Sequence, residues 1–124
     1  MRGVTRIVIL AAALLGLVAV LPPAAQAATH DGQWSVLVIT EKGTCDRAYR
    51  YGIRVAEGRL RYEGDASVDM AGTVAPNGLV KVSIRLGNQG AHGSGRLSGS
   101  TGAGTWRGAG SSGECSGRWE AERR

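Results

Sequence analysis

The sequence predicts an all-β protein: a single antiparallel up-and-down meander of eight strands, closed into a small barrel and held by one disulfide. Apolar and polar residues alternate through most of the chain beyond residue 30, which is the two-residue period of half-buried strands. Turn-forming residues separate the alternating runs at steady spacing, as in small barrels and sandwiches. A Gly-x-Trp frame recurs three times, and in a strand its glycine and tryptophan point to the same face. The three copies are Gly32-Gln33-Trp34, Gly104-Thr105-Trp106 and Gly117-Arg118-Trp119.

The strands follow one another with short turns. Residues 33–40 are apolar on both faces, which predicts a covered strand, whereas residues 45–55 place Tyr49 and Tyr51 opposite Arg50 and Arg54. The expected strands are 33–40, 45–55, 59–63, 67–74, 79–86, 91–98, 103–109 and 114–122. The turn signals are Lys42-Gly43, Glu57-Gly58, Gly64-Asp65, Pro76-Asn77-Gly78, Asn88-Gln89, Ser100-Thr101 and Ser111-Ser112.

Strand register tests this assignment, because a slip by one residue would move every side chain to the other face. In the predicted register each large ring faces a glycine, which is how a sheet accommodates both. The alternative is that residues 87–117, with 11 glycines in 31 residues, form a flexible low-complexity segment. The expected inward pairs are Val74 with Val80, Ile84 with Gly93, Val82 with Gly95, Gly95 with Trp106, Trp106 with Gly117, and Gly104 with Trp119.

The N-terminus has the features of an export signal. Arg2 and Arg6 precede an apolar run over residues 7–21, and Ala25-Gln26-Ala27 fits the small-x-small cleavage pattern. A transmembrane anchor is the competing interpretation, but it needs roughly 20 apolar residues and the run has about 15. We therefore expect residues 1–27 to be a removed signal peptide and residues 28–124 to be one β domain, periplasmic or extracellular, with no transmembrane segment left after processing.

Cys45 and Cys115 are the only cysteines. An even count in an oxidising compartment predicts a structural disulfide between them. Redox chemistry is the alternative, but it usually needs the Cys-x-x-Cys spacing that activates a thiolate, and this chain lacks that spacing. A bond across a loop of about 70 residues would stabilise the domain by about 4 kcal/mol on the chain-entropy model.

Two resemblances accompany these patterns. The Gly32-Gln33-Trp34 frame, the eight-stranded meander and the terminal Arg123 and Arg124 resemble the calycin-type barrels, including lipocalins. That resemblance implies that the tryptophan plugs the barrel floor under a basic residue from a late strand. The chain is short for a lipocalin, and no helix follows the last strand.

The segments Cys45-Asp46-Arg47-Ala48-Tyr49-Arg50-Tyr51 and Gly113-Glu114-Cys115-Ser116-Gly117-Arg118-Trp119 resemble a family of small exported β-barrel proteins of soil alphaproteobacteria. Some of these proteins carry a haem-utilisation or adhesion label, but the family has no established functional residues to carry over. The candidate axial ligands here would be His30, His92 and Met70, which we place in the N-terminal tail, on an outward strand face and in the core.

Catalytic and metal-binding constellations are missing from the sequence. The two histidines have no nucleophile and orienting group in a recognisable arrangement, and Glu63, Asp65 and Asp69 lack calcium-loop spacing. We expect a protein that is not an enzyme and that needs no cofactor or metal. Removal of residues 1–27 takes away two arginines and no acidic residue, so the net charge falls from +5 to +3. This positive charge is too small to indicate that the protein binds nucleic acid.

One predicted surface departs from ordinary strand chemistry. The register places Arg54 opposite Arg61 on the outer face, and like charges directly opposed destabilise a sheet. With Arg50 and Arg59 they would form a basic patch suited to carboxylate or phosphate groups, as in acidic polysaccharide or another anionic envelope component. The alternative is a solubilising basic face.

Three functions from different classes follow. The first is an exported binding or surface-interaction module that uses the basic patch. The second is an inhibitor of a secreted protease that inserts residues 28–33 into a cleft, which an ordered, protruding N-terminus would favour. The third is a carrier of a small apolar ligand inside the barrel, which a large pocket would favour.

Overall fold

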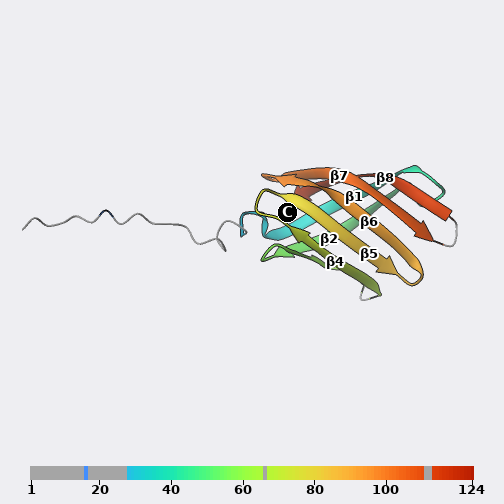
Figure 1. The fold of residues 1–124 in the computed structure, drawn as a ribbon, viewed down its shortest axis with the longest axis horizontal. Coiled ribbons are helices and arrows are strands. Elements are labelled where there is room, and N and C mark those ends of the chain that lie inside the picture. Colours follow the sequence, from blue (N-terminus) through green and yellow to red (C-terminus); the bar gives the residue numbers. More distant parts are fainter. Residues whose placement is uncertain (1–15, 17–27, 66, 111–112) are drawn as a thin grey trace, which may run out of the picture.

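The computed structural model describes residues 16, 28–65, 67–110 and 113–124, and its strands form one closed antiparallel barrel (Figure 1). Each strand pairs with the next along the chain, and β8 pairs with β1 to close the barrel. The predicted all-β meander of eight strands is thus confirmed. The elements are η1 (Ala28–His30), β1 (Gly32–Lys42), β2 (Ala48–Ala56), β3 (Arg59–Tyr62), β4 (Val68–Val74), β5 (Leu79–Leu86), β6 (Gln89–Ser98), β7 (Thr101–Gly110) and β8 (Gly113–Arg123). The predicted signal peptide lies outside the described residues, apart from Gly16.

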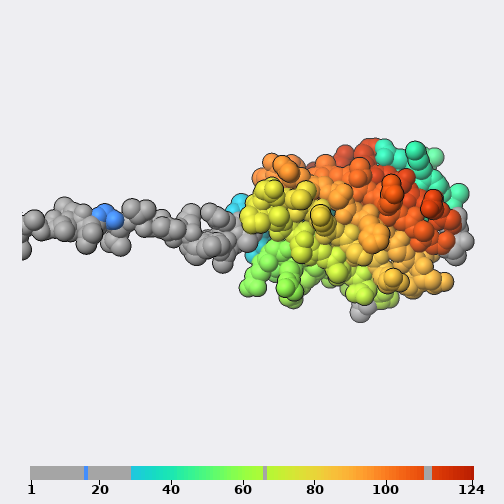
Figure 2. All heavy atoms as spheres, viewed as in Figure 1, coloured from blue at the N-terminus to red at the C-terminus, as the bar shows by residue number. Residues whose placement is uncertain are grey.

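The buried core occupies one end of the barrel. In an up-and-down meander, the starts of odd strands and the ends of even strands meet at the same end, and the largest buried side chains come from these positions. η1 and the C-terminus also lie at this end, which we call the closed end; in the space-filling view η1 sits against one end of a rounded body (Figures 1 and 2). The core residues are Trp34, Ile53, Val55, Leu60, Val74, Val80, Leu97, Trp119 and Ala121.

For the expected inward pairs, the register agrees with the prediction in two hairpins and differs in two. Val74 faces Val80, and Trp106 faces Gly117, as expected. The β5–β6 and β6–β7 pairings are displaced by two residues, so Val82, not Ile84, faces Gly93. Likewise Trp106 faces Gly93 rather than Gly95. A shift of two preserves which face each side chain occupies, so the predicted inward residues remain inward.

Glycine explains the displacement. The two-residue turns are Gly87-Asn88 and Gly99-Ser100, one position earlier than predicted, and both glycines have a φ of 63°. A positive φ at the first central residue is typical of the type II′ hairpin turn, which favours glycine at that position. The prediction centred these turns on polar residues and missed the glycine that each turn requires.

The glycine-rich half is a sheet whose glycines make room for two indoles. Trp119 on β8 faces Gly104 on β7 and reaches across it to donate its Nε1–H to the carbonyl of Ser94 on β6, 3.1 Å away. Trp106 on β7 likewise faces Gly117 on β8 and donates to the carbonyl of Ile39 on β1, 3.0 Å away. Each indole thereby links alternate strands, so residues 87–117 are not a flexible segment in the part that is described.

The disulfide ties the opposite end of the barrel. Cys45 and Cys115 are bonded, with their Cα atoms 6.1 Å apart. Cys45 lies in the β1–β2 loop, because β2 begins only at Ala48, and not in the strand as predicted. β8 is the neighbour of β1, so closure of the barrel brings Cys115 to this loop.

Candidate functional site

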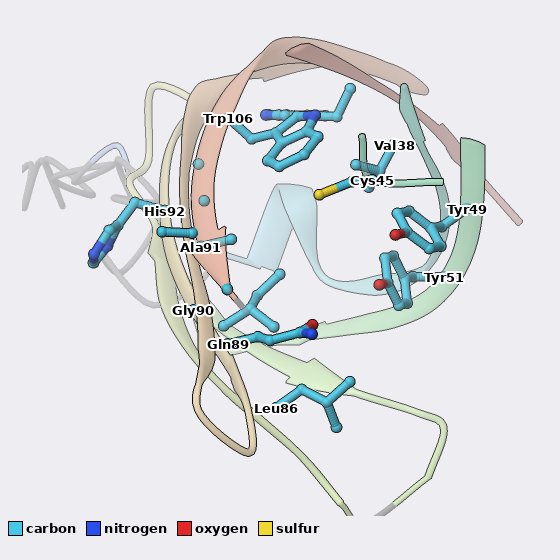
Figure 3. Close-up of a pocket in the computed structure, with 16 residues that line it drawn as sticks. Val38, Cys45, Tyr49, Tyr51, Leu86, Gln89, Gly90, Ala91, His92 and Trp106 are labelled. Carbon is cyan, nitrogen blue, oxygen red and sulfur yellow. The ribbon is translucent and has the colours of Figure 1, made fainter. Parts of the chain in front are cut away.

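A cavity of about 210 Å³ occupies the end of the barrel opposite the buried core, which we call the open end (Figure 3). Its lining comes from β1, the β1–β2 loop, β2 and β5–β8, so the cavity exists only because the barrel closes. The lining residues are Val38, Cys45, Tyr49, Tyr51, Ile84, Leu86, Gln89, Gly90, Ala91, His92, Gly93, Trp106, Gly108, Ala109, Gly110 and Trp119.

The two long walls of this cavity differ in chemistry. Ala91 and Gly93 on β6, together with Gly108 and Gly110 on β7, project nothing larger than a methyl group. Side chains normally fill the interior of an eight-stranded barrel or leave room for one small ligand, and here the small residues leave the space open. The cavity therefore follows from the same glycine content that accommodates the indoles.

The facing wall is aromatic. Tyr49 and Tyr51 on β2 stack with ring centroids 6.0 Å apart, and Tyr51 meets Tyr62 on β3 edge-on at 5.7 Å. The hydroxyls of Tyr49 and Tyr51 point into the cavity from the side opposite Ala91 (Figure 3). The alternation over residues 45–55 predicts that these tyrosines face inward, but it cannot show that the opposite wall leaves the space between unfilled.

No lining side chain brings a charge into the cavity. His92 is the only histidine of the lining, and its ring points away from the barrel interior (Figure 3). Burial raises the pKa of the Tyr51 hydroxyl above its ordinary value of 10.0, and the neighbouring Tyr49 and Tyr62 raise it further. Tyr51 is therefore a neutral hydrogen-bond donor and acceptor at physiological pH.

The closed end is sealed by the segment that leads into β1. Trp34 is 1% exposed and donates its Nε1–H to the carbonyl of His30 at 3.0 Å. The Arg123 guanidinium lies 4.6 Å from the centre of the Trp34 ring and donates to the carbonyls of Asp31 (2.7 Å) and Thr29 (2.8 Å). These contacts hold residues 29–31 against the closed end of the barrel.

Two side chains of this segment reach the neighbouring turns. His30 is buried, and its Nε2 lies 3.1 Å from the carbonyl of Pro76. The Asp31 carboxylate accepts the backbone N–H of Glu57 at 2.9 Å. The N-terminal segment over residues 29–31 is therefore docked on the barrel and does not protrude.

The four arginines of the predicted basic patch all lie on the outer face of β2 and β3. Arg54 faces Arg61, and all four side chains are exposed. Two of them already have partners. Arg54 lies 3.5 Å from the Glu63 carboxylate, and Arg50 donates to the Ser35 hydroxyl at 3.1 Å.

Glu63 relieves part of the repulsion that sequence reasoning assigned to the Arg54–Arg61 pair. Glu63 lies two residues beyond Arg61 and therefore on the same face of the strand. This spacing in the sequence could have identified Glu63 as an ion-pair partner for the arginines. Arg59 and Arg61 have no ion pair within residues 28–65, 67–110 and 113–124.

A second basic surface on the outer face was not predicted. An open depression of about 680 Å³ spans β5–β8 and the end of β1 and includes Lys42, Lys81 and Arg107. The cross-strand pairs His92–Arg107, Arg107–Ser116 and Ser116–Lys42 place Arg107 and Lys42 in one row, and Lys81 pairs with Ser94 in the neighbouring row. Lys42 joins the row only because β8 pairs with β1, and this closure could not be located from the sequence spacing.

The residues considered as haem ligands lie in different places. His30 is buried at the closed end, His92 is on the outer face, and Met70 packs against the core. Within the described ranges no three His, Cys, Asp or Glu side chains gather as a metal site would need. The same residues contain no helix with the length and apolar character to cross a membrane. A comparison with protein-family models, curated proteins and solved structures finds no match to this chain, so the geometry of the barrel is what bears on function.

Proposed function

We propose that the protein is an exported, non-catalytic binding module that holds a small apolar ligand in the open end of its barrel. The observation that carries this proposal is the cavity of about 210 Å³, which is lined mainly by apolar, aromatic and glycine residues and into which no charged side chain points. Ligand sites are typically concave and mostly apolar, with a few polar groups that fix orientation, and the mouth of a β-barrel is one of their usual places. The disulfide is compatible with an oxidising, exported compartment.

Inhibition of a secreted protease is less well supported. It requires a free N-terminal segment to enter a cleft, whereas Thr29 and Asp31 are held by Arg123, and the His30 carbonyl accepts the Trp34 indole. Release of this segment would expose Trp34 and break all three hydrogen bonds.

A titration followed by NMR tests the proposal. Small apolar probes such as cyclohexanol, n-octanol and 2-naphthol should shift the resonances of Tyr51, Ala91 and Trp106 in a saturable way. Ala91→Phe, which fills the cavity, should abolish these shifts, whereas Ala103→Phe on the exposed outer face should leave them unchanged. If no probe binds, or if the two variants behave alike, the cavity is not a ligand site.

Binding of anionic groups at the basic patch is a second candidate. It is supported by the exposed guanidinium groups of Arg59 and Arg61, which have no ion pair in the described part of the chain, beside Arg54 and Arg50. An acidic polysaccharide or another anionic envelope component would supply the carboxylate or phosphate groups that planar guanidinium forks recognise. Retention on a heparin column that declines with salt is the measurement that tests this candidate.

A further inference from the structure

We infer that the ligand of the open-end cavity is a flat, uncharged molecule of one or two rings that carries a hydrogen-bonding substituent. This inference rests on the proposed function and adds the size, shape and polarity of the ligand. The size follows from the volume of the cavity, the shape from its two walls, and the polarity from the groups that point inward.

The size of the ligand follows from the volume. A cavity of about 150 Å³ accepts benzene, and pockets for drug-sized ligands begin at about 300 Å³. The open-end cavity, at about 210 Å³, lies between these limits. One ring or two fused rings fit within this volume, whereas a long acyl chain, a tetrapyrrole or a steroid would project beyond the mouth of the barrel.

The shape of the ligand follows from the two walls. Over Ala91, Gly93, Gly108 and Gly110 the β6–β7 wall presents backbone and a single methyl group. Two larger side chains border this flat area: Trp106 on β7, and Gln89 on β6, which lies against Gly110. The Tyr49–Tyr51 stack faces this wall across the barrel (Figure 3). A flat ring placed between the walls can lie against the backbone on one side and meet tyrosine rings on the other, in the offset or edge-on arrangements that aromatic rings prefer.

The polarity of the ligand follows from the groups that point inward. The hydroxyls of Tyr49 and Tyr51 and the side-chain amide of Gln89 point into the cavity (Figure 3). They can donate to or accept from a hydroxyl, carbonyl or ring nitrogen of the ligand. No cation or anion of the lining faces the interior, and burial of an unpaired charge is costly, so the ligand should be neutral.

Calorimetric titration of the full exported chain with three probes tests this inference. 2-Naphthol is flat and carries a hydroxyl, naphthalene is flat without one, and n-octanol is a flexible alcohol. We expect 2-naphthol to bind tightest. Tyr51→Phe should weaken 2-naphthol binding by about 3- to 10-fold, the effect of losing one hydrogen bond, and should leave naphthalene binding unchanged.

The possible failures are distinct. If n-octanol binds as tightly as 2-naphthol, and Ala91→Phe abolishes the binding of both probes, the cavity is a ligand site but does not prefer flat molecules. If Tyr51→Phe weakens naphthalene as much as 2-naphthol, the hydroxyl is not used. If no probe binds, both this inference and the proposed function are wrong. Because Tyr51→Phe preserves the ring, it keeps the test valid even if Ala91→Phe fails to fold.

Discussion

Trp119 and Ser94 are joined by a hydrogen bond across an intervening strand: the indole Nε1–H of β8 donates to a main-chain carbonyl of β6, 3.1 Å away. The ring can take this path only because β7 has Gly104 at the crossing point. A Cβ added at Gly104 would meet the Ser94 carbonyl oxygen, and it would lie 2.6 Å from the Trp119 Nε1. A tryptophan and a glycine on neighbouring strands therefore function as one packing unit.

Gly104→Val should destabilise the protein by about 3 kcal/mol, because the new side chain takes the space of the Trp119 ring and crowds a backbone that cannot move away. Urea denaturation followed by tryptophan fluorescence measures the loss. Gly117→Val should behave similarly, because its Cβ would meet the Ile39 carbonyl.

Gly52→Val is the matched control for these variants. Gly52 also lies within a strand, but the nearest atom to an added Cβ is the Glu63 Cβ at 4.0 Å. Valine has the higher strand propensity, so this variant should be as stable as the parent or slightly more stable. Equal destabilisation by Gly52→Val and Gly104→Val would show that the strands tolerate no side chain at any glycine and that the indole plays no special part.

The strand faces could be predicted from the sequence because a period of two depends only on local alternation. Tyr49, Tyr51, Trp106 and Trp119 were all placed correctly on the inner face. The turn positions were harder, because the type II′ geometry at Gly87 and Gly99 depends on φ values that composition shows only indirectly.

The cavity could not be predicted for a different reason. It depends on the summed volume of side chains from six strands and a loop around the barrel, and a difference of a few methyl groups separates a filled interior from an open one. Ala91 and the glycines beside it were visible in the sequence. Their position opposite Tyr49 and Tyr51 was not, because it follows from how the barrel closes.

The Cys45–Cys115 bond should supply a large part of the stability of this small domain. Replacing both cysteines with serine should lower the free energy of unfolding by about 4 kcal/mol, since the bond closes a loop with a sequence separation of 70 residues. The melting temperature should fall by more than about 10 °C. Labelling of native-purified protein with a thiol reagent under denaturing conditions provides the control, and two reactive thiols per chain would mean that the bond does not form in the native protein.

Arg123 should contribute far more to the stability of the fold than its neighbour Arg124. Arg123→Ala removes the guanidinium from the Trp34 ring and leaves the Thr29 and Asp31 carbonyls without their donor, so it should cost about 2–3 kcal/mol. Arg124→Ala removes the same charge from an exposed side chain and keeps the backbone N–H that donates to the Gln33 carbonyl, so stability should be unchanged. Equal effects of the two variants in chemical denaturation would show that only the C-terminal charge matters.

Tyr51 should make the folded protein sensitive to alkali. Its pKa is raised in the folded state, so above about pH 10 the unfolded chain releases this proton more readily than the folded barrel does. The stabilisation is therefore complete below about pH 10 and is lost as pH rises through the folded pKa. Tyr51→Phe should flatten the fall in melting temperature between neutral pH and about pH 11, and an unchanged fall would assign the alkaline transition to other groups.

The basic patch should bind heparin through the position of its arginines and not merely through the net charge of the protein. Two double variants that each remove two positive charges, from different surfaces, distinguish these causes. Arg54→Gln with Arg61→Gln should abolish retention of the protein on heparin, and retention of the parent should weaken with salt, because the Debye length falls to about 3 Å at 1 M. Lys81→Gln with Arg107→Gln removes the same charge from the other basic surface and should leave retention nearly intact. The stability of the Arg54–Arg61 variant should hold, because relief of repulsion between the paired arginines offsets the loss of the exposed Arg54–Glu63 ion pair. If both double variants lose retention equally, heparin responds to net charge alone; if only the Lys81–Arg107 variant loses it, the anion site lies across β5–β8 and not on β2 and β3.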